Sequence, residues 1–263
     1  MFLIDFLIIL LLIRLLIRPI ETNYNSIYSL IYRITDYLLK PAKIVVRDDF
    51  KSILLSVLGL LIIKGLIYFS ISHFTLLAGL GIAFYNLLQL LFQFYMVVWF
   101  IAILTGDRQH TSVISVLQRA FLPLGSISSK LNIPRKSFSI FSFVFLLAAY
   151  SILSFMLNIF IFNGSFSSLY FLRSVAEGLL LIIRLFPGFF SIVIIVSALL
   201  SWVSPDPYNP VVQTIYGISE PLLTPFRKII PNLGGLDISP LVAILCFQIV
   251  GGQLDGLLRQ ILH

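Results

Sequence analysis

Charged residues are scarce in this chain, and their scarcity excludes a soluble globular domain. Only 11% of the 263 residues are Asp, Glu, Lys or Arg, whereas about 25% are charged in an average soluble domain. Hydrophobic residues make up 59%, and the mean hydropathy is +1.04. A chain of this composition is predicted to be an integral membrane protein.

Cysteine and histidine are also scarce, which argues against redox, metal and nucleophilic chemistry. The lone Cys246 excludes an intrachain disulfide and is expected to act as a small buried hydrophobe. His73, His110 and His263 lie far apart, so no set of metal or haem ligands is indicated. The chain also lacks an HExxH motif, a Ser-His-Asp spacing signature and a glycine-rich phosphate loop. The sequence therefore predicts neither an enzyme nor a bound cofactor.

Long apolar runs dominate what is present, and they predict an all-α protein with about six transmembrane helices. Each run reaches or approaches the roughly 20 residues that a spanning helix needs. The first is interpreted as a retained span rather than a signal peptide, because Asp5 lies early in it and Arg14 late. The runs cover residues 2–17, 52–72, 75–105, 138–162, 170–203 and 239–258.

A mixed stretch after the first run matches a stretch before the last run at a constant offset of 184 residues. The first reads NYNSIYSLIYRITDYLLKPAKIV and the second DPYNPVVQTIYGISEPLLTPFRKI. Shared hydrophobicity does not align Tyr, Asn and Pro without a gap, so the match indicates an internal repeat. The identical pairs include Tyr24/Tyr208, Asn25/Asn209, Ile31/Ile215, Tyr32/Tyr216, Ile34/Ile218, Leu38/Leu222, Leu39/Leu223 and Pro41/Pro225.

A weaker mixed stretch lies between the third and fourth runs. Either its Pro123 or its Pro134 matches Pro225, and both alternatives stay open. We predict three repeated units, each made of a span, an interfacial amphipathic helix and a second span. The first unit covers residues 1–74, a degenerate middle unit covers 75–165, and the C-terminal unit covers 166–263.

Positive charge is concentrated in the mixed stretches. Of the 18 Lys and Arg residues, 13 fall in segments 18–51, 106–137 and 204–238. If these segments share one side of the membrane, the positive-inside rule places that side in the cytoplasm. A basic surface there faces anionic headgroups, so membrane lipids are expected partners. The charges are too thinly spread to indicate nucleic-acid binding.

The two matched stretches have the spacing of amphipathic helices that lie in the membrane interface. In 26–40 the apolar side chains recur at helical spacing, and the same holds in 211–223. Helices of about 13 residues are too short to span a bilayer, but they can rest with one face in the acyl boundary.

Three cap–proline pairs follow one another at intervals of 15 residues: Asn209–Pro210, Thr224–Pro225 and Ser239–Pro240. Asn, Thr and Ser accept hydrogen bonds from the first amides of a helix, and Pro suits the first helical position. The pairs therefore predict the starts of an interfacial helix, a short helical turn through Arg227, and the final span. Pro221 and Pro231 are predicted to end the elements before them, and Gly234–Gly235 to permit a bend.

Arg227 and Lys228 lie at the centre of this segment, and two roles are open for them. They could anchor the turn to lipid phosphates or pair with Glu220 or Asp237. Alternatively, they could form a docking site for an acidic loop of a partner protein or for an anionic lipid.

Charges inside the apolar runs are costly in hydrocarbon and are therefore candidates for function. Lys64, beside Gly65, is expected to take part in a polar pathway or an inter-helix contact. Arg173 and Glu177 are spaced to form a salt bridge along one helix, which places 170–186 partly in the interface. Arg14 is expected to snorkel to the membrane surface. Asp255 and Arg259 are expected to pair near the C-terminus.

The sequence resembles the YggT family. The residues that carry the resemblance are SWVSPDPYNP at 201–210 and SEPLLTPFRKIIPNLGGLDISP at 219–240, with a decayed copy over 1–70 in which Arg18 stands where Trp202 stands in the last unit. The resemblance implies an integral protein of the bacterial inner membrane, or less readily of a plastid membrane. It also implies roles in osmotic-stress tolerance, in cell division or in the assembly of membrane complexes, and it carries over no catalytic residues.

Two functions are compatible with these observations. The first is a non-enzymatic scaffold or assembly factor for other membrane protein complexes, with a membrane-protein partner or a second copy of this chain as its expected partner. The second is a channel or transporter for an ion or osmolyte, with Lys64, Arg173 and Glu177 near its path.

Overall fold

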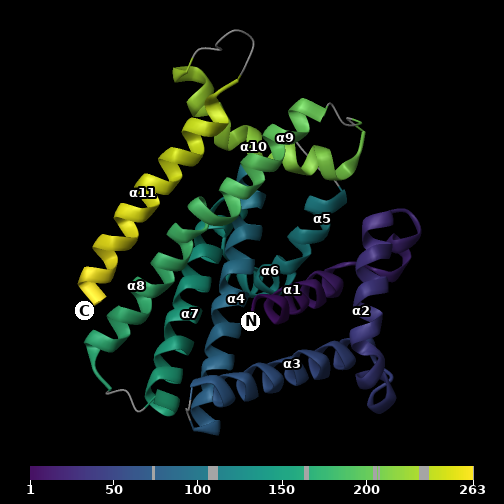
Figure 1. Cartoon of the computed structure of the whole chain (residues 1–263), viewed down its shortest axis with the longest axis vertical. Coiled ribbons are helices and arrows are strands. Elements are labelled where there is room, and N and C mark those ends of the chain that lie inside the picture. Colours follow the sequence, from purple (N-terminus) through teal and green to yellow (C-terminus); the bar gives the residue numbers. More distant parts are fainter. Residues whose placement is uncertain are drawn as a thin grey trace. The chain divides into compact units, whose positions relative to one another are not determined.

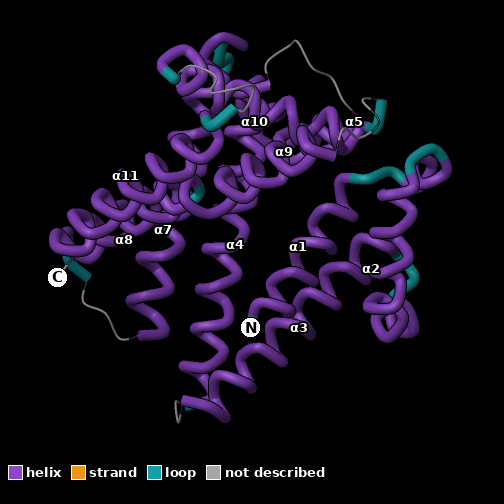
Figure 2. Tube along the Cα trace, turned by 45° about the horizontal axis from the view of Figure 1, so that its top comes forward, coloured by secondary structure: helices purple, strands orange, loops and turns teal. Residues whose placement is uncertain are grey.

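The computed structural model describes residues 1–72, 75–105, 112–162, 166–203, 206, 208–230 and 237–262. All regular secondary structure in these ranges is helical (Figures 1 and 2). The α-helices are α1 (Phe2–Leu16), α2 (Ser26–Val45), α3 (Asp49–Ser72), α4 (Leu76–Thr105), α5 (Ser112–Gln118), α6 (Leu122–Lys130), α7 (Phe138–Phe162), α8 (Ser168–Arg184), α9 (Ser191–Val203), α10 (Pro210–Ile229) and α11 (Ser239–Leu262).

Among the described residues, five helical segments are long and apolar enough to cross a membrane. The protein is therefore an all-α, multi-pass membrane protein. The first apolar run, predicted as a sixth span, forms α1, whose 15 residues cover about 22 Å. That length is shorter than the hydrocarbon core of about 30 Å. The five segments are Asp49–Ile71, Leu76–Thr105, Arg135–Ile161, Ser168–Val203 and Ser239–Gln260.

The segment Ser168–Val203 is helical over 36 residues, although Pro187 lies within it. A π-helix, Phe186–Phe190, joins α8 to α9, and the amide of Phe190 donates to the carbonyl of Leu185. The wider π turn absorbs the backbone disturbance that a proline causes in an α-helix. The segment is longer than a bilayer requires, and the partly interfacial position of 170–186 stays a prediction.

The chain divides into two compact units. The first contains Met1–Phe94 and Ile152–Tyr170, and the second contains Tyr95–Ser151 and Phe171–His263. The predicted division into three repeated units, at 1–74, 75–165 and 166–263, stays a prediction.

In the first unit, α1, α2 and α3 pack against one another, and α2 lies across the ends of α1 and α3 (Figure 1). Leu11, Leu39 and Ile53 form the apolar core of this arrangement, one from each helix. Gly65 on α3 meets α4 closely, because a Cβ atom there would lie 2.6 Å from a methyl group of Leu80. The small residue thus permits the close helix approach that its place beside Lys64 predicts.

In the second unit, α9, α10 and α11 also pack against one another. The buried face of α10 includes Ile218, Leu222 and Leu223. Around the π-helix, aromatic rings pack edge to face, with Phe186 against Phe100 and Phe247. Edge-to-face packing of such rings adds about 0.5–1.5 kcal/mol for each pair beyond the burial of their area.

The prediction that Pro221 ends a helix and that Thr224–Pro225 starts another is wrong. Both prolines lie inside α10, which is continuous from Pro210 to Ile229. An internal proline costs about 3 kcal/mol in an isolated helix. Burial of Leu222 and Leu223, which is worth about 1.5–3 kcal/mol for each side chain, offsets this cost.

The middle mixed stretch forms two short helices, α5 and α6, separated by a 3-10 turn, Arg119–Phe121. Pro123 lies in the first turn of α6, and Pro134 directly precedes a second 3-10 turn, Arg135–Ser137. Neither position reproduces the internal proline of α10, so the choice between the two matches stays open.

Candidate functional site

Arg227 joins the end of α10 to the start of α11. Its guanidinium donates to the carboxylates of Glu220 on α10 and of Asp237, the latter at 2.7 Å. Asp237 also accepts the backbone amide of Ser239, the first residue of α11, at 2.9 Å. Of the roles predicted for Arg227, the structure contains the intramolecular pairing, and it involves both acids.

These contacts change the acid–base properties of the group. Burial lowers the pKa of the Arg227 guanidinium, but its hydrogen bonds to Glu220 and Asp237 outweigh burial and raise the pKa above its ordinary value. Burial likewise raises the pKa of Asp237, but hydrogen bonds from Ser239 and Arg227 hold it below its ordinary value. The ion pairs therefore persist at neutral pH.

An equivalent arrangement lies in the first unit, at the end of α2. Lys43 Nζ is 3.6 Å from Asp36 Oδ1 on α2 and 3.0 Å from Asp49 Oδ1, the first residue of α3. Lys43 and Arg227 are 184 positions apart, as are Asp36 and Glu220. We call each arrangement a charge bridge. In it, a basic residue near the end of an amphipathic helix joins an acid about two turns earlier to an acid at or just before the start of the next helix.

The two amphipathic helices correspond along their whole length. Helices α2 and α10 each have 20 residues, and their first and last residues are 184 positions apart. Asn25 and Asn209 cap them, because each side chain accepts the backbone amide two residues further on. The cap–proline pair Asn209–Pro210 thus starts α10, with Pro210 as its first residue.

The equivalent residues Thr35 and Ser219 tie each amphipathic helix to the helix before it. Thr35 Oγ1 accepts a hydrogen bond from Arg14 of α1 at 2.8 Å, and Ser219 Oγ bonds to Ser197 Oγ of α9 at 2.8 Å. Both side chains are fully buried. In both units, a buried hydroxyl on the amphipathic helix thus makes the hydrogen bond to the preceding helix.

The prediction that Arg14 snorkels to the membrane surface is wrong. Its side chain is only 3% exposed and lies between α1 and α2. It donates to Thr35 Oγ1 and the Tyr32 carbonyl, pairs with Asp36 at 2.8 Å, and stacks over the Tyr32 ring. These partners satisfy the charge within the protein, so the side chain has no need to reach water.

Of the two remaining cap–proline pairs, Thr224–Pro225 lies within a helix and Ser239–Pro240 lies at the start of one. Thr224 and Pro225 are exposed on α10, and the Thr224 hydroxyl donates to the Glu220 carbonyl rather than capping a new helix. Helix α11 begins at Ser239, with Pro240 in its first turn, but its first amide is accepted by Asp237. Pro231, Gly234 and Gly235 lie outside the described residues, as do His73, His110 and His263.

The charged residues of α8 make an unexpected contact. Arg184 Nε donates to Asp255 Oδ1 of α11 at 2.6 Å, and Asp255 also pairs with Arg259 at 2.7 Å, as their spacing predicts. Arg173 and Glu177 are both half-buried on α8, and their salt bridge stays a prediction. The structure thus connects α8 to α11 through Arg184.

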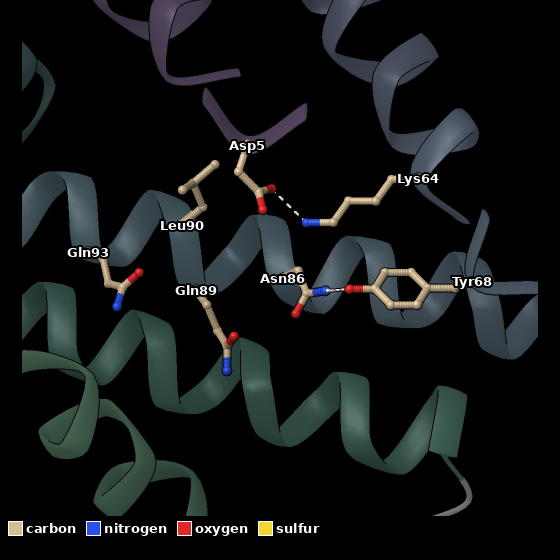
Figure 3. A pocket seen from close by; sticks show the side chains of 7 residues that line it. All are labelled: Asp5, Lys64, Tyr68, Asn86, Gln89, Leu90 and Gln93. Carbon is tan, nitrogen blue, oxygen red and sulfur yellow. Dashed lines mark hydrogen bonds and ion pairs between the residues drawn. The ribbon is translucent and has the colours of Figure 1, made fainter. Parts of the chain in front are cut away.

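Lys64 lies in a polar pocket of the first unit. Its side chain is 2% exposed, and its ammonium nitrogen is 2.6 Å from Asp5 Oδ1 of α1 (Figure 3). The contact joins α1 to α3, which is an inter-helix contact of the kind predicted for Lys64. The pocket has a volume of about 250 Å³ and is lined by Asp5, Lys64, Tyr68, Asn86, Gln89, Leu90 and Gln93.

Helix α4 supplies the amide side of this pocket, which the sequence prediction missed. Asn86, Gln89 and Gln93 recur at helical spacing within a highly apolar span, and all three are half-buried. The Asn86 amide donates to the Tyr68 hydroxyl at 2.8 Å. Three amides on one face of a spanning helix were a visible signal, because such groups are costly in hydrocarbon without polar partners.

Comparison with known proteins identifies the C-terminal part of the chain. Residues 176–258 match the model of the family described as CCB3/YggT. Over these residues the chain is similar to the YggT family. They contain α10, the charge bridge of Arg227 and the Arg184–Asp255 contact, whereas the Lys64 pocket lies outside them.

Relatives in this family share only part of their length with the chain. An uncharacterized Pseudomonas aeruginosa protein is 52% identical over 66 residues, which are 25% of this chain and 34% of that protein. An uncharacterized Vibrio alginolyticus protein is 39% identical over 71 residues, 27% of this chain and 38% of that protein. The uncharacterized protein YggT of Escherichia coli is 32% identical over 73 residues, 28% of this chain and 38% of that protein.

The chain thus spans roughly a third of the length of the curated relatives it matches. None of their descriptions names a reaction. No solved structure matches the chain. Within the described residues, no group of three or more His, Cys, Asp or Glu residues is placed to hold a metal ion.

Proposed function

We propose that the protein is a non-enzymatic scaffold or assembly factor for other membrane protein complexes, in the bacterial cytoplasmic membrane. One observation carries the proposal: two equivalent amphipathic helices, α2 and α10, are each held across the neighbouring spans by a charge bridge. A helix fixed in this way presents a constant surface to partners, without any reactive group.

The exposed basic residues of these helices are the contact points in this proposal. Arg227 is engaged within the protein, whereas the adjacent Lys228 is exposed at the end of α10. On α2, Arg33 and Lys40 are exposed too. An acidic loop of a partner protein, or an anionic headgroup, is the complementary chemistry.

The orientation is part of the proposal. The basic segments face the cytoplasm under the positive-inside rule. The resemblance to the YggT family supports a role in assembling membrane complexes, or in osmotic-stress and cell-envelope processes. A plastid membrane is the less favoured alternative.

The decisive experiment is recovery of the protein in native lipid nanodiscs after mild crosslinking, followed by mass spectrometry. We expect a membrane-protein complex in near-stoichiometric amount with the wild type and with Lys228→Arg. Lys228→Glu should lose it while remaining folded, since the Lys228 side chain is exposed and forms no hydrogen bond or ion pair with the described residues. Arg227→Glu is the poorer probe, because it would place a third carboxylate beside Glu220 and Asp237.

Recovery of the chain alone, or of equal partner amounts with all three forms, would contradict the scaffold proposal. A homo-oligomer that resists Lys228→Glu would count against the proposed contact surface as well.

A second candidate function, a channel or transporter for an ion or osmolyte, is favoured by the polar pocket around Lys64. It predicts that Lys64→Ala changes solute flux in liposomes that contain only this protein, and that Glu177→Gln does so as well. Unchanged flux in both variants would exclude this second function as described.

A further inference from the structure

The Lys64 pocket contains unused hydrogen-bonding capacity next to a buried charge. An ammonium group has three N–H donors. Among the described residues, Lys64 Nζ has one acceptor, Asp5 Oδ1. Because Lys64 is 1% exposed overall, its remaining donors need acceptors inside the pocket.

Asp5 has complementary capacity. Its Oδ1 accepts from Lys64, and no donor within the described part of the chain contacts its Oδ2. The carboxylate side chain is 30% exposed and lines the pocket. The pocket therefore offers donors from Lys64 and an acceptor from Asp5 within one small volume.

Charge balance restricts what such a site can bind. An anion at Lys64 would also meet the Asp5 carboxylate 2.6 Å away, and a cation at Asp5 would meet the Lys64 ammonium. In a region of low dielectric each of these repulsions is large. A molecule that carries both charges can place its negative end at Lys64 and its positive end at Asp5, and it leaves the net charge of the pocket unchanged.

The rest of the lining suits the polar body of such a molecule. Gln89, Gln93 and Asn86 supply amides, and Tyr68 supplies a hydroxyl. The volume of about 250 Å³ is smaller than the roughly 300–1,000 Å³ of pockets for drug-sized ligands. The site is thus sized for a small polar molecule rather than a lipid or a peptide.

We propose that this pocket binds a small zwitterion with a carboxylate and an ammonium group, such as a free amino acid. The carboxylate accepts hydrogen bonds from Lys64, and the ammonium group donates to Asp5. The inference goes beyond the scaffold function and does not require transport, because a site that binds without moving its ligand fits a protein whose assembly responds to a solute.

The test is equilibrium binding of radiolabelled glycine, serine and glutamine to the whole protein in nanodiscs. At least one amino acid should bind saturably, while acetate and methylammonium, which carry one charge each, should bind at least about tenfold more weakly. Lys64→Met and Asp5→Asn should each weaken amino-acid binding about tenfold or more, since each removes a charge-assisted hydrogen bond.

Two further variants protect the test from misfolding. Gln93→Leu changes the pocket wall without touching the ion pair, and it should weaken binding severalfold. Gln253→Leu makes the same chemical change at an exposed position of α11, outside the pocket, and should leave binding unchanged.

Absence of saturable binding of all three amino acids would overturn the inference and indicate that water alone fills the pocket. Equal affinity for acetate, methylammonium and the amino acids would overturn it too. Equilibrium binding requires neither solute transport nor a partner protein. Failure of the flux experiment or of partner recovery would therefore not change the binding result, and each proposal can fail by itself.

Discussion

Asn25 and Asn209, 184 positions apart, each accept the backbone amide of the residue two positions further on, at the first turn of an amphipathic helix of 20 residues. The two caps have the same residue type, the same partner position and similar distances of 3.0 and 2.9 Å. The helices that follow also end 184 positions apart, and each carries an internal proline at the equivalent place. Local sequence thus produces the same capped helix twice.

Loss of a cap should loosen the first turn of its helix. Asn209→Ala removes the acceptor of the Val211 amide and should cost about 1 kcal/mol, whereas Asn209→Asp should retain the cap. Hydrogen–deuterium exchange of the amides at 211–213 in nanodiscs measures the effect. Asn25→Ala should show the same loss at 27–29, and unchanged protection in both alanine variants would rule out capping by these side chains.

The buried Arg14–Thr35 contact should be energetically coupled. A double-mutant cycle with Arg14→Met and Thr35→Val should give a coupling energy of about 1–3 kcal/mol, because a hydrogen bond to a charged group is lost in either single variant. Unfolding in mixed micelles by detergent titration measures it. Arg18→Gln, at an exposed position of the same segment, should have little effect; additive single effects would contradict the coupling.

The close contact of α3 with α4 should make glycine necessary at position 79. A Cβ atom at Gly79 would lie 2.7 Å from the carbonyl oxygen of Gly65, so Gly79→Ala should destabilise the first unit by about 1–3 kcal/mol. Gly59→Ala is a matched control on α3, where a Cβ atom meets nothing within 4 Å. It should stabilise by about 0.5–1 kcal/mol. Equal effects of the two substitutions on the unfolding midpoint would argue against the contact.

The stability of the second unit should depend on the ionisation of Asp237. Its pKa is lowered in the folded protein, so its contribution is fully present above the ordinary carboxyl value of 3.8 and is lost as pH falls through the lower folded value. Asp237→Asn should be less stable at neutral pH and should lack this acid-dependent loss. Thermal unfolding of the wild type and of Asp237→Asn in detergent, between about pH 2.5 and pH 6, measures the difference in stability. If the stability of both forms changed with pH in the same way, the Asp237 carboxylate would not be held by Arg227 and Ser239.

The three-unit arrangement predicts the sides of the membrane on which the connecting segments lie. With Cys246 replaced by Ser, single cysteines at 107 and 206 should react with an impermeant maleimide only from the cytoplasm. A cysteine at 165 should react only from the opposite side. Positions 107 and 165 lie outside the described residues, and 206 lies between α9 and α10. Labelling of 107 from outside the cell would contradict the arrangement.

Features that depend on residues close in sequence could be predicted from the sequence. The apolar runs, the amphipathic face of α10, the cap at Asn209 and the Asp255–Arg259 pair all follow from spacing within one helix. Such patterns act over a few residues, where backbone geometry alone decides which side chains meet.

The effect of a proline could be predicted from local sequence at one position of α10 but not at another. Pro225 was predicted to start an element, yet it lies inside α10, because burial of the opposite face of the helix offsets the lost backbone hydrogen bond. Pro210, at the first position of the same helix, follows the local rule since its missing amide would have had no helical partner.

The sequence by itself determined that this is an all-α membrane protein with two matching amphipathic helices, the second of them capped by Asn209, since composition and short-range spacing are sufficient for these features. Only the tertiary structure decided where the intramembrane charges go. Lys64 meets Asp5 across 59 positions, and Arg184 meets Asp255 across 71. A charge in an apolar surrounding must find a partner, and helix packing brings that partner from a distant part of the chain.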